Sequence, residues 1–145
     1  MYSPQPERTP SAITIAEFRD YQSTLEMDQP LVVLEELAQD WAVARIPIAN
    51  VATRPGGYVP GPTMMGAVDY LGWILVFTRL GITPMALTWD LSISFLRPAI
   101  GGDVVVRARQ TKFGTFSHST YELSIDGDPD RLVAHGTTTY AVPRD

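Results

Sequence analysis

Residues 61–81 read GPTMMGAVDYLGWILVFTRLG and include the one long apolar stretch of the chain. This stretch predicts an α-helix that begins near Pro62, because proline is favoured at the first helical position. Gly81 is a typical helix stop. The apolar side chains point in almost every direction around the helix, so other structure must wrap around it. The stretch is short for a membrane span and contains Asp69, which favours a buried helix.

Strands are predicted on both sides of this helix. Downstream of it, apolar and polar residues alternate with the period of a β-strand, and glycine-rich or acidic turns separate the segments. These predicted strands cover residues 87–95, 104–113, 117–125 and 132–142. Upstream, residues 31–48 predict two further strands around a turn near Gln39 and Asp40.

The N-terminal part has a different character. Residues 1–12 contain three prolines in the first ten positions, and we expect a flexible arm there. Thr14 and Glu17 then form a capping box, which predicts a short amphipathic helix over residues 14–27. Residues 13–145 are predicted to form a single domain, because 145 residues are too few for two ordinary domains.

These elements predict an α+β fold. One buried helix and a long antiparallel sheet can bury both surfaces only if the sheet curls around the helix. This is the hotdog fold, in which a curled antiparallel sheet wraps around a central helix, here with a short N-terminal helix added.

The composition excludes several classes of function. Sixteen acidic residues against 11 basic ones give a net charge of −5, which disfavours nucleic-acid binding. The chain has no cysteine, and its two histidines show no metal-binding spacing, so we predict neither a metal site nor another cofactor. The N-terminus resembles neither a signal peptide nor a membrane anchor. We therefore expect a cytoplasmic protein with no membrane partner.

Asp69 and Gly61 are the candidate chemical groups. A carboxylate in an apolar helix must be hydrogen-bonded to a structural partner, lie on a solvent-facing stripe, or face a substrate. Gly61 precedes the helix, where its N–H could bind an oxyanion, or it only serves the shape of the loop. Eight helical residues rise about 12 Å, so both groups could reach one carbonyl only if two antiparallel copies shared the site.

Three segments carry a family resemblance. Residues 57–69 (GYVPGPTMMGAVD), 87–98 (LTWDLSISFLRP) and 134–140 (AHGTTTY) resemble hotdog acyl-CoA thioesterases of the phenylacetate-degradation type. The likeness spans about residues 31–143. In that family a G-x-x-H-G-G turn precedes the catalytic Asp by six residues. The resemblance implies that Asp69 is the catalytic carboxylate and that the Gly61 amide polarises the thioester carbonyl.

The chain departs from the family pattern at three positions. Pro60 stands where the motif has histidine, and Pro62 replaces its second glycine. Arg54 takes the place of the usual asparagine. The turn is therefore typical of a subgroup with a G-P turn, in which Gly61 is the main candidate amide.

The resemblance predicts an acyl-CoA thioesterase, a homodimer or homotetramer, with Asp69 as general base or nucleophile. The alternative, favoured by Pro60 and Pro62, is a non-catalytic hotdog protein that binds acyl thioesters or serves as an assembly subunit. Six further residues are candidates for substrate binding. Tyr58, Met64, Met65 and Val68 could line an acyl pocket or simply pack in the core, and Arg97 and Lys112 could contact CoA phosphates or be solvated strand ends.

Overall fold

The N-terminal helix is short and well capped. The structure is a computed structural model that describes residues 7–25 and 32–144. Helix α1 (Ile15–Gln22) begins with the predicted capping box, in which the Thr14 hydroxyl accepts from the Glu17 N–H at 3.1 Å. It ends at Gln22, earlier than predicted, and the hydroxyls of Ser23 and Thr24 donate back to main-chain carbonyls. The predicted last turn, at residues 26 and 27, lies outside the described residues.

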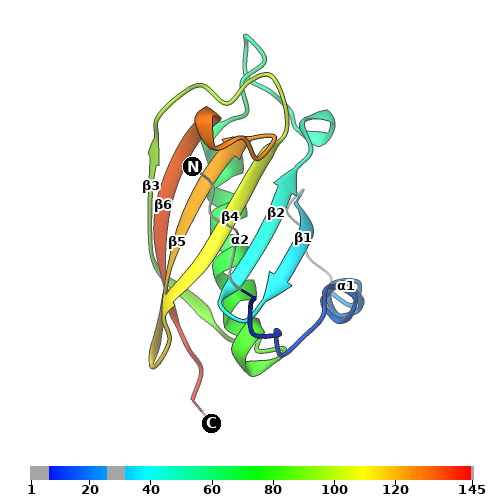
Figure 1. Cartoon of the computed structure of the whole chain (residues 1–145), viewed down its shortest axis with the longest axis vertical. Helices are drawn as coiled ribbons and strands as arrows, with labels where there is room; N and C mark the ends of the chain where they lie inside the picture. The colour runs from blue at the N-terminus through cyan, green and yellow to red at the C-terminus, as the bar shows by residue number, and fades with distance from the viewer. Residues whose placement is uncertain (1–6, 26–31, 145) are drawn as a thin grey trace.

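The strands form one six-stranded antiparallel sheet in the order β1-β2-β4-β5-β6-β3. Its strands are β1 (Val33–Ala38), β2 (Trp41–Ile46), β3 (Leu87–Phe95), β4 (Val104–Lys112), β5 (Phe116–Ile125) and β6 (Leu132–Ala141). Short 3-10 turns, η1 (Ile48–Asn50) and η2 (Pro129–Arg131), follow β2 and precede β6. The sheet curls around the long helix α2, which confirms the predicted hotdog fold (Figure 1).

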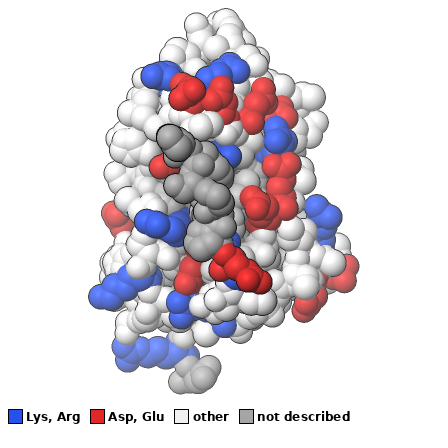
Figure 2. Space-filling model, in the orientation of Figure 1, with Lys and Arg blue, Asp and Glu red and all other residues white. Residues whose placement is uncertain are grey.

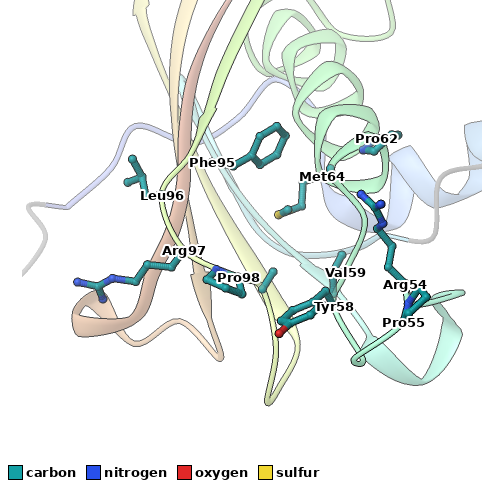
Figure 3. A pocket seen from close by; sticks show the side chains of 12 residues that line it. Arg54, Pro55, Tyr58, Val59, Pro62, Met64, Phe95, Leu96, Arg97 and Pro98 are labelled. Carbon is teal, nitrogen blue, oxygen red and sulfur yellow. The ribbon is translucent and has the colours of Figure 1, made fainter.

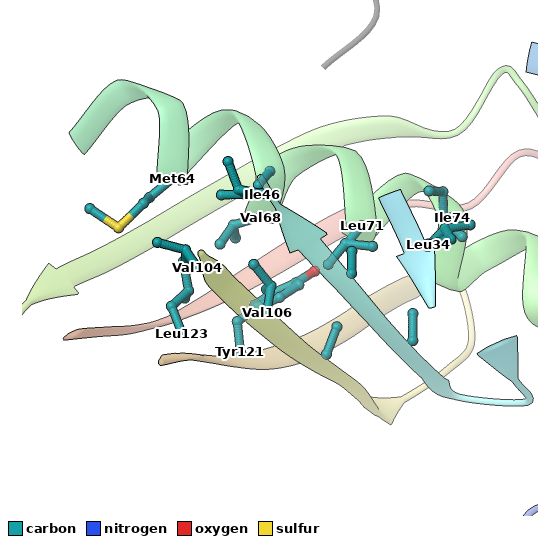
Figure 4. Close-up of a cluster of buried hydrophobic side chains, with 14 of the residues drawn as sticks. Leu34, Ile46, Met64, Val68, Leu71, Ile74, Val104, Val106, Tyr121 and Leu123 are labelled. Carbon is teal, nitrogen blue, oxygen red and sulfur yellow. The ribbon is translucent and has the colours of Figure 1, made fainter. Parts of the chain in front are cut away.

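Helix α2 (Gly61–Leu80) forms the centre of the core. Its side chains meet the concave face of the sheet, where period-2 alternation turns every second residue inward (Figure 4). The buried side chains drawn there include Val68, Leu71 and Ile74 of α2 and Val104, Val106, Tyr121 and Leu123 of β4 and β5. On the side that the sheet leaves open, α1 covers α2 around Tyr70 and Trp73, whereas Met65 and Gly66 stay exposed.

Aromatic packing holds α1 against α2. The Phe18 ring lies 6.0 Å from the Tyr70 ring and 6.4 Å from the Trp73 ring, in edge-to-face geometry. The Gln22 side-chain amide donates to the Tyr70 hydroxyl at 2.7 Å.

Within the predicted N-terminal arm, residues 1–6 lie outside the described residues. Arg8, farther along it, stacks 3.6 Å over the Trp41 ring on the convex face of the sheet.

The two edges of the sheet differ in character. Strand β1 is short, carries a bulge between Leu34 and Glu36, and lies beside α1 (Figure 1). Strand β3 is nine residues long and exposes large apolar side chains. Leu87 is 64% exposed, Trp89 69% and Phe95 48%. A short edge strand that is covered by another element is protected from further pairing, whereas a long apolar edge is a template for another strand.

On one face of the molecule, charges of both signs lie close together (Figure 2). The face shown in Figure 2 carries Lys and Arg side chains next to Asp and Glu side chains, with no continuous basic area among the described residues. In residues 7–25 and 32–144, no helix is long and apolar enough to cross a membrane.

A polar network ties the β1–β2 turn to the end of α2. Asp40 adopts the left-handed conformation with φ 65°, and its carboxylate accepts two hydrogen bonds from Arg79 at 2.7 Å each. Gln110 of β4 donates to the same carboxylate at 2.7 Å. Burial raises the pKa of Asp40, but the hydrogen bonds from Arg79 and Gln110 outweigh it and hold the pKa below its usual value.

This network predicts a pH-dependent contribution to stability. Asp40→Asn is expected to lower the free energy of unfolding by about 1 kcal/mol at pH 7, since asparagine tolerates the left-handed backbone but loses the charge. Because the folded-state pKa is depressed, the contribution of the ionised carboxylate is complete above the unfolded pKa, whose usual value is 3.8, and is lost as the pH falls through the folded value. Urea unfolding from about pH 7 to about pH 2 should therefore show the two proteins converging in acid. A difference that stays constant with pH would contradict this role.

Candidate active site

The carboxylate of Asp69 lies where α2 meets strands β3 and β6. Its Oδ1 accepts a hydrogen bond from the Thr88 hydroxyl at 2.5 Å and one from the Tyr140 hydroxyl at 2.6 Å. The Tyr140 hydroxyl also lies 2.5 Å from the Asp69 main-chain oxygen. Both side-chain hydrogen bonds to the carboxylate therefore converge on one of its two oxygens.

A β-bulge brings Thr88 to this site. Strict alternation along β3 would place Thr88 on the same face as Asp90, away from the helix. The register instead shifts at Trp89, so that Thr88 pairs with Tyr140 and Asp90 with Thr139. One extra residue in a strand redirects the side chains that precede it, and here it turns the Thr88 hydroxyl towards α2.

The two oxygens of the Asp69 carboxylate have different surroundings. Among the described residues, no hydrogen-bond partner is recorded for Oδ2, and the side chain is partly exposed. Burial, together with the hydrogen bond to Asp69, raises the pKa of Tyr140 well above its usual value. The phenol therefore stays protonated and acts as a donor. Oδ1 is thus held by two neutral donors, whereas Oδ2 has no hydrogen-bond partner among the described residues.

Gly61 occupies the first position of α2. Pro60 is the N-cap, and the Thr63 N–H already donates to the Pro60 carbonyl at 3.1 Å. Pro62 has no N–H. Among residues 7–25 and 32–144, no hydrogen-bond acceptor is recorded for the Gly61 N–H. It is thus a hydrogen-bond donor without a recorded acceptor at the positive end of a 20-residue helix, and an oxyanion can bind to such a donor.

A cavity of about 780 Å³ opens beside this amide. It lies between the 54–64 segment and the 95–99 segment (Figure 3). A hydrogen bond from the Val59 N–H to the Ala99 carbonyl, 2.9 Å long, connects these two segments. The lining residues are Arg54, Pro55, Tyr58, Val59, Gly61, Pro62, Met64, Phe95, Leu96, Arg97, Pro98 and Ala99. The walls are mainly apolar, with two arginines at the margin, which suits an apolar ligand that carries charge at one end.

Four of the eight predicted site residues line this cavity, namely Tyr58, Gly61, Met64 and Arg97. The Arg97 side chain extends away from Met64 and donates to the Asp130 carbonyl at 2.9 Å (Figure 3). The remaining four, Asp69, Met65, Val68 and Lys112, do not line it.

These four residues occupy other parts of the fold. Val68 is fully buried in the core, and Met65 is 39% exposed on the outer side of α2. Lys112 is exposed at the end of β4, opposite the end of the sheet at which β3 reaches Phe95. Asp69 lies eight helical residues after Gly61, about 12 Å along the axis. Asp69 and the cavity beside Gly61 are therefore separate features of one chain.

Sequence reasoning did not assign a role to Phe95, Thr88 or Tyr140. The Phe95 ring lies over the start of α2, 3.1 Å from where a Cβ on Gly61 would be. All three lie in segments that carry the family resemblance, but within these segments they look like ordinary members of alternating strands. The position of the strand bulge and the curvature of the sheet bring them to the site.

No metal centre is present among the described residues, because no group of three or more His, Asp or Glu side chains in residues 7–25 and 32–144 is placed to hold an ion.

Comparison with known proteins agrees with this architecture. A family model described as the thioesterase superfamily matches residues 56–134, which include both Gly61 and Asp69. No curated protein sequence matches the chain significantly.

Solved structures show the same fold over nearly the whole chain. A proposed thioesterase from Silicibacter sp. TM1040 is 27% identical with a TM-score of 0.82, and the match covers 94% of this chain and 96% of that one. Zebra fish thioesterase superfamily member 2 is 20% identical with a TM-score of 0.77, covering 91% and 100%. A thioesterase from Haemophilus influenzae is 16% identical with a TM-score of 0.78, covering 95% and 96%. The chain therefore belongs to the thioesterase superfamily, and its class of activity is thioester hydrolysis.

Proposed function

We propose that the chain hydrolyses acyl-CoA thioesters, with Asp69 as general base or nucleophile and the Gly61 amide as oxyanion donor. The observation that carries this proposal is the Asp69 carboxylate, which is partly exposed on a mainly apolar helix and has Oδ1 hydrogen-bonded and Oδ2 without a partner among the described residues. A carboxylate that served structure alone would gain from having both oxygens paired, because an unpaired oxygen contributes no hydrogen bond.

The chemistry needs few groups. As a general base, Asp69 takes a proton from water while the water oxygen attacks the thioester carbonyl carbon. The carbonyl oxygen becomes an oxyanion that accepts from the Gly61 N–H. When the C–S bond breaks, the thiolate leaves without strong acid assistance and later takes up a proton, and the acyl group leaves as a carboxylic acid. As a nucleophile, Asp69 would attack the same carbon and expel the thiolate as the C–S bond breaks, which leaves an acyl–Asp69 anhydride; water would then hydrolyse the anhydride to the carboxylic acid and free Asp69.

We further propose that this site is shared between two copies of the chain. The Gly61 amide and Asp69 lie about 12 Å apart along one helix, too far to contact one carbonyl group. Pairing of two β3 edges would cover the exposed Leu87 and Trp89 and bring two α2 helices side by side. The two-fold axis of such a dimer would place Asp69 of one copy near Gly61 of the other.

The exposed side of α2 suits this arrangement. Among the described residues, no atom from outside this stretch of α2 lies within 4 Å of the position that a Cβ on Gly66 would take, so a second helix could approach closely there. Met65 beside it is 39% exposed and adaptable in shape. Whether two such dimers form a tetramer, and whether the protein is cytoplasmic, stay predictions of the sequence.

The cavity supplies a site for the substrate next to the reacting carbonyl. The apolar side chains that would contact the substrate there are those of Tyr58, Met64 and Phe95. At the margin of the cavity lie Arg54 and Arg97. In the proposed complex these arginines are the candidates for the phosphate groups of CoA. Lys112, which the sequence also predicts as a phosphate contact, lies at the opposite end of the sheet in the same chain.

Release of free thiol tests the proposal. Purified protein is incubated with a panel of acyl-CoA esters that differ in chain length and aromatic character, and the free thiol is measured with a chromogenic disulfide reagent. We expect turnover of at least one ester at about 1 s⁻¹ or more, within the ordinary range for enzymes. If no ester is cleaved while one binds, the non-catalytic binding alternative replaces hydrolysis.

A further inference from the structure

The Tyr140 hydroxyl joins two acceptors of a single residue. It lies 2.5 Å from the Asp69 main-chain oxygen and 2.6 Å from Asp69 Oδ1. Because both acceptors belong to Asp69, this contact fixes the carboxylate relative to the backbone of α2. A bond to the carboxylate alone would leave its rotation about the side-chain bonds less restricted.

The helix leaves space for the Tyr140 ring at a cost to its own stability. Gly72 follows Asp69 by three residues and so shares its face of α2. A Cβ on Gly72 would lie 2.5 Å from Tyr140 Cε1 and 2.9 Å from the Tyr121 hydroxyl, closer than atoms can approach. A glycine inside a helix costs about 1 kcal/mol relative to alanine. Gly72 therefore admits the two tyrosine rings where a larger residue would exclude them.

Packing on the other side keeps the Tyr140 ring in place. Tyr140 is 3% exposed and forms a small buried cluster with Val76 and Ala86. Its strand β6 lies between β5 and β3, paired on both sides, and is therefore one of the most constrained strands of the sheet. A donor held in this way has little freedom to follow a moving carboxylate.

From this geometry we propose that Tyr140 is a positioning residue for Asp69. Its hydroxyl holds Oδ1 and the main-chain oxygen together, so that Oδ2 keeps one orientation towards water or the thioester. The inference rests on the proposed hydrolysis, since it assigns a role within that site. Orientation of a reacting group is worth a large factor in rate, and a displacement of about 1 Å can cost about 100-fold.

Tyr121 provides a matched control. Its buried hydroxyl lies beside Gly72, 2.9 Å from where a Cβ would be, but its hydrogen-bond partner is the Thr138 hydroxyl at 2.6 Å rather than Asp69. Tyr140→Phe and Tyr121→Phe therefore each remove one buried hydroxyl from the same region of the core. Only Tyr140→Phe removes a donor to the carboxylate.

The test is a comparison of kcat and KM for the full-length protein and the two variants with the best acyl-CoA ester of the panel. Tyr140→Phe should lower kcat about 10- to 100-fold and leave KM within about twofold, because Tyr140 does not line the cavity. Tyr121→Phe should keep kcat within about threefold of the parent. Assays are run at a temperature at which circular dichroism shows all three proteins fully folded.

The outcomes separate this inference from the proposed function. A Tyr140→Phe variant with parental kcat overturns the positioning role. An equal loss of kcat in both variants also overturns it, and so does a change that appears only as a higher KM. In those cases the hydrolase proposal stands if the parent cleaves the ester and Asp69→Asn does not. If the parent cleaves no ester, the hydrolase proposal itself fails.

Discussion

Asp69→Asn is expected to lower kcat for the best acyl-CoA ester by at least about 100-fold while the fold stays intact. The amide keeps the size of the carboxylate, and its oxygen can still accept from Thr88 and Tyr140. It can neither take a proton from water nor attack a carbonyl carbon. Steady-state thiol release gives kcat, and thermal unfolding shows whether the variant is as well folded as the parent.

The matched control for this variant is Asp90→Asn. Asp90 lies on β3 two residues after Thr88, faces away from α2, and is exposed. The control removes the same charge from the same part of the sheet, so it should retain most of the parental kcat. Equal activity of Asp69→Asn and the parent would exclude Asp69 from the chemistry, and only the fold-level assignment would remain.

Gly61→Pro should lower kcat by about 100- to 1000-fold, the loss typical of removing one oxyanion donor. The substitution deletes the Gly61 N–H, for which no acceptor is recorded among the described residues. It does so at the first helical position, where proline is favoured, and after Pro60, whose extended backbone (ψ 146°) suits a residue that precedes proline. We therefore expect α2 to form as before.

Gly61→Ala is the matched control, because it keeps the N–H. Both substitutions place a Cβ 3.1 Å from the Phe95 ring and before Pro62, so the steric cost of that Cβ is common to both. The difference in kcat between the Gly61→Ala and Gly61→Pro variants isolates the amide. If the two variants have equal kcat, the Gly61 amide does not stabilise the oxyanion.

The variants Asp69→Asn and Gly61→Pro together test whether the site is shared between copies. Homodimers of Asp69→Asn lack the carboxylate at both sites, and homodimers of Gly61→Pro lack the amide at both. Random assortment of the two chains, by co-expression, would give mixed dimers in which one of two sites has both groups, or about a quarter of the parental activity overall. Activity no higher than that of the single variants, with mixed dimers present by sedimentation and mass spectrometry, would contradict a shared site.

Much of the fold was predictable from local patterns. The apolar run of α2 requires a surrounding sheet, and the alternation in 104–113, 117–125 and 132–142 predicts strands that the structure confirms within a few residues. The Thr14 capping box likewise marks the start of α1 correctly. Such patterns are readable because hydrogen bonding and amphipathic period act over a few neighbouring residues.

The prediction was weakest where contacts between distant segments decide the outcome. The alternation in 87–95 predicts a strand with one apolar face, yet Leu87, Trp89 and Phe95 are exposed in the single chain. The end of α1 at Gln22 was also missed, because serine and threonine hydroxyls can compete with a continuing helix. In the candidate site, Tyr58, Gly61, Met64 and Arg97 line one cavity together with Phe95, to which the sequence assigned no role.

The sequence by itself determined that the chain has an apolar helix with a carboxylate within it and a glycine at its start. These features depend only on residue types and on their spacing along one element. Tertiary structure decided which oxygen of that carboxylate is engaged. The bulge at Trp89 turns Thr88 inward, and the closing of β6 onto α2 beside Gly72 brings in Tyr140, 71 residues farther along the chain. A one-residue change of register reverses the face of a side chain, and the pattern of a strand carries no mark of where that change occurs.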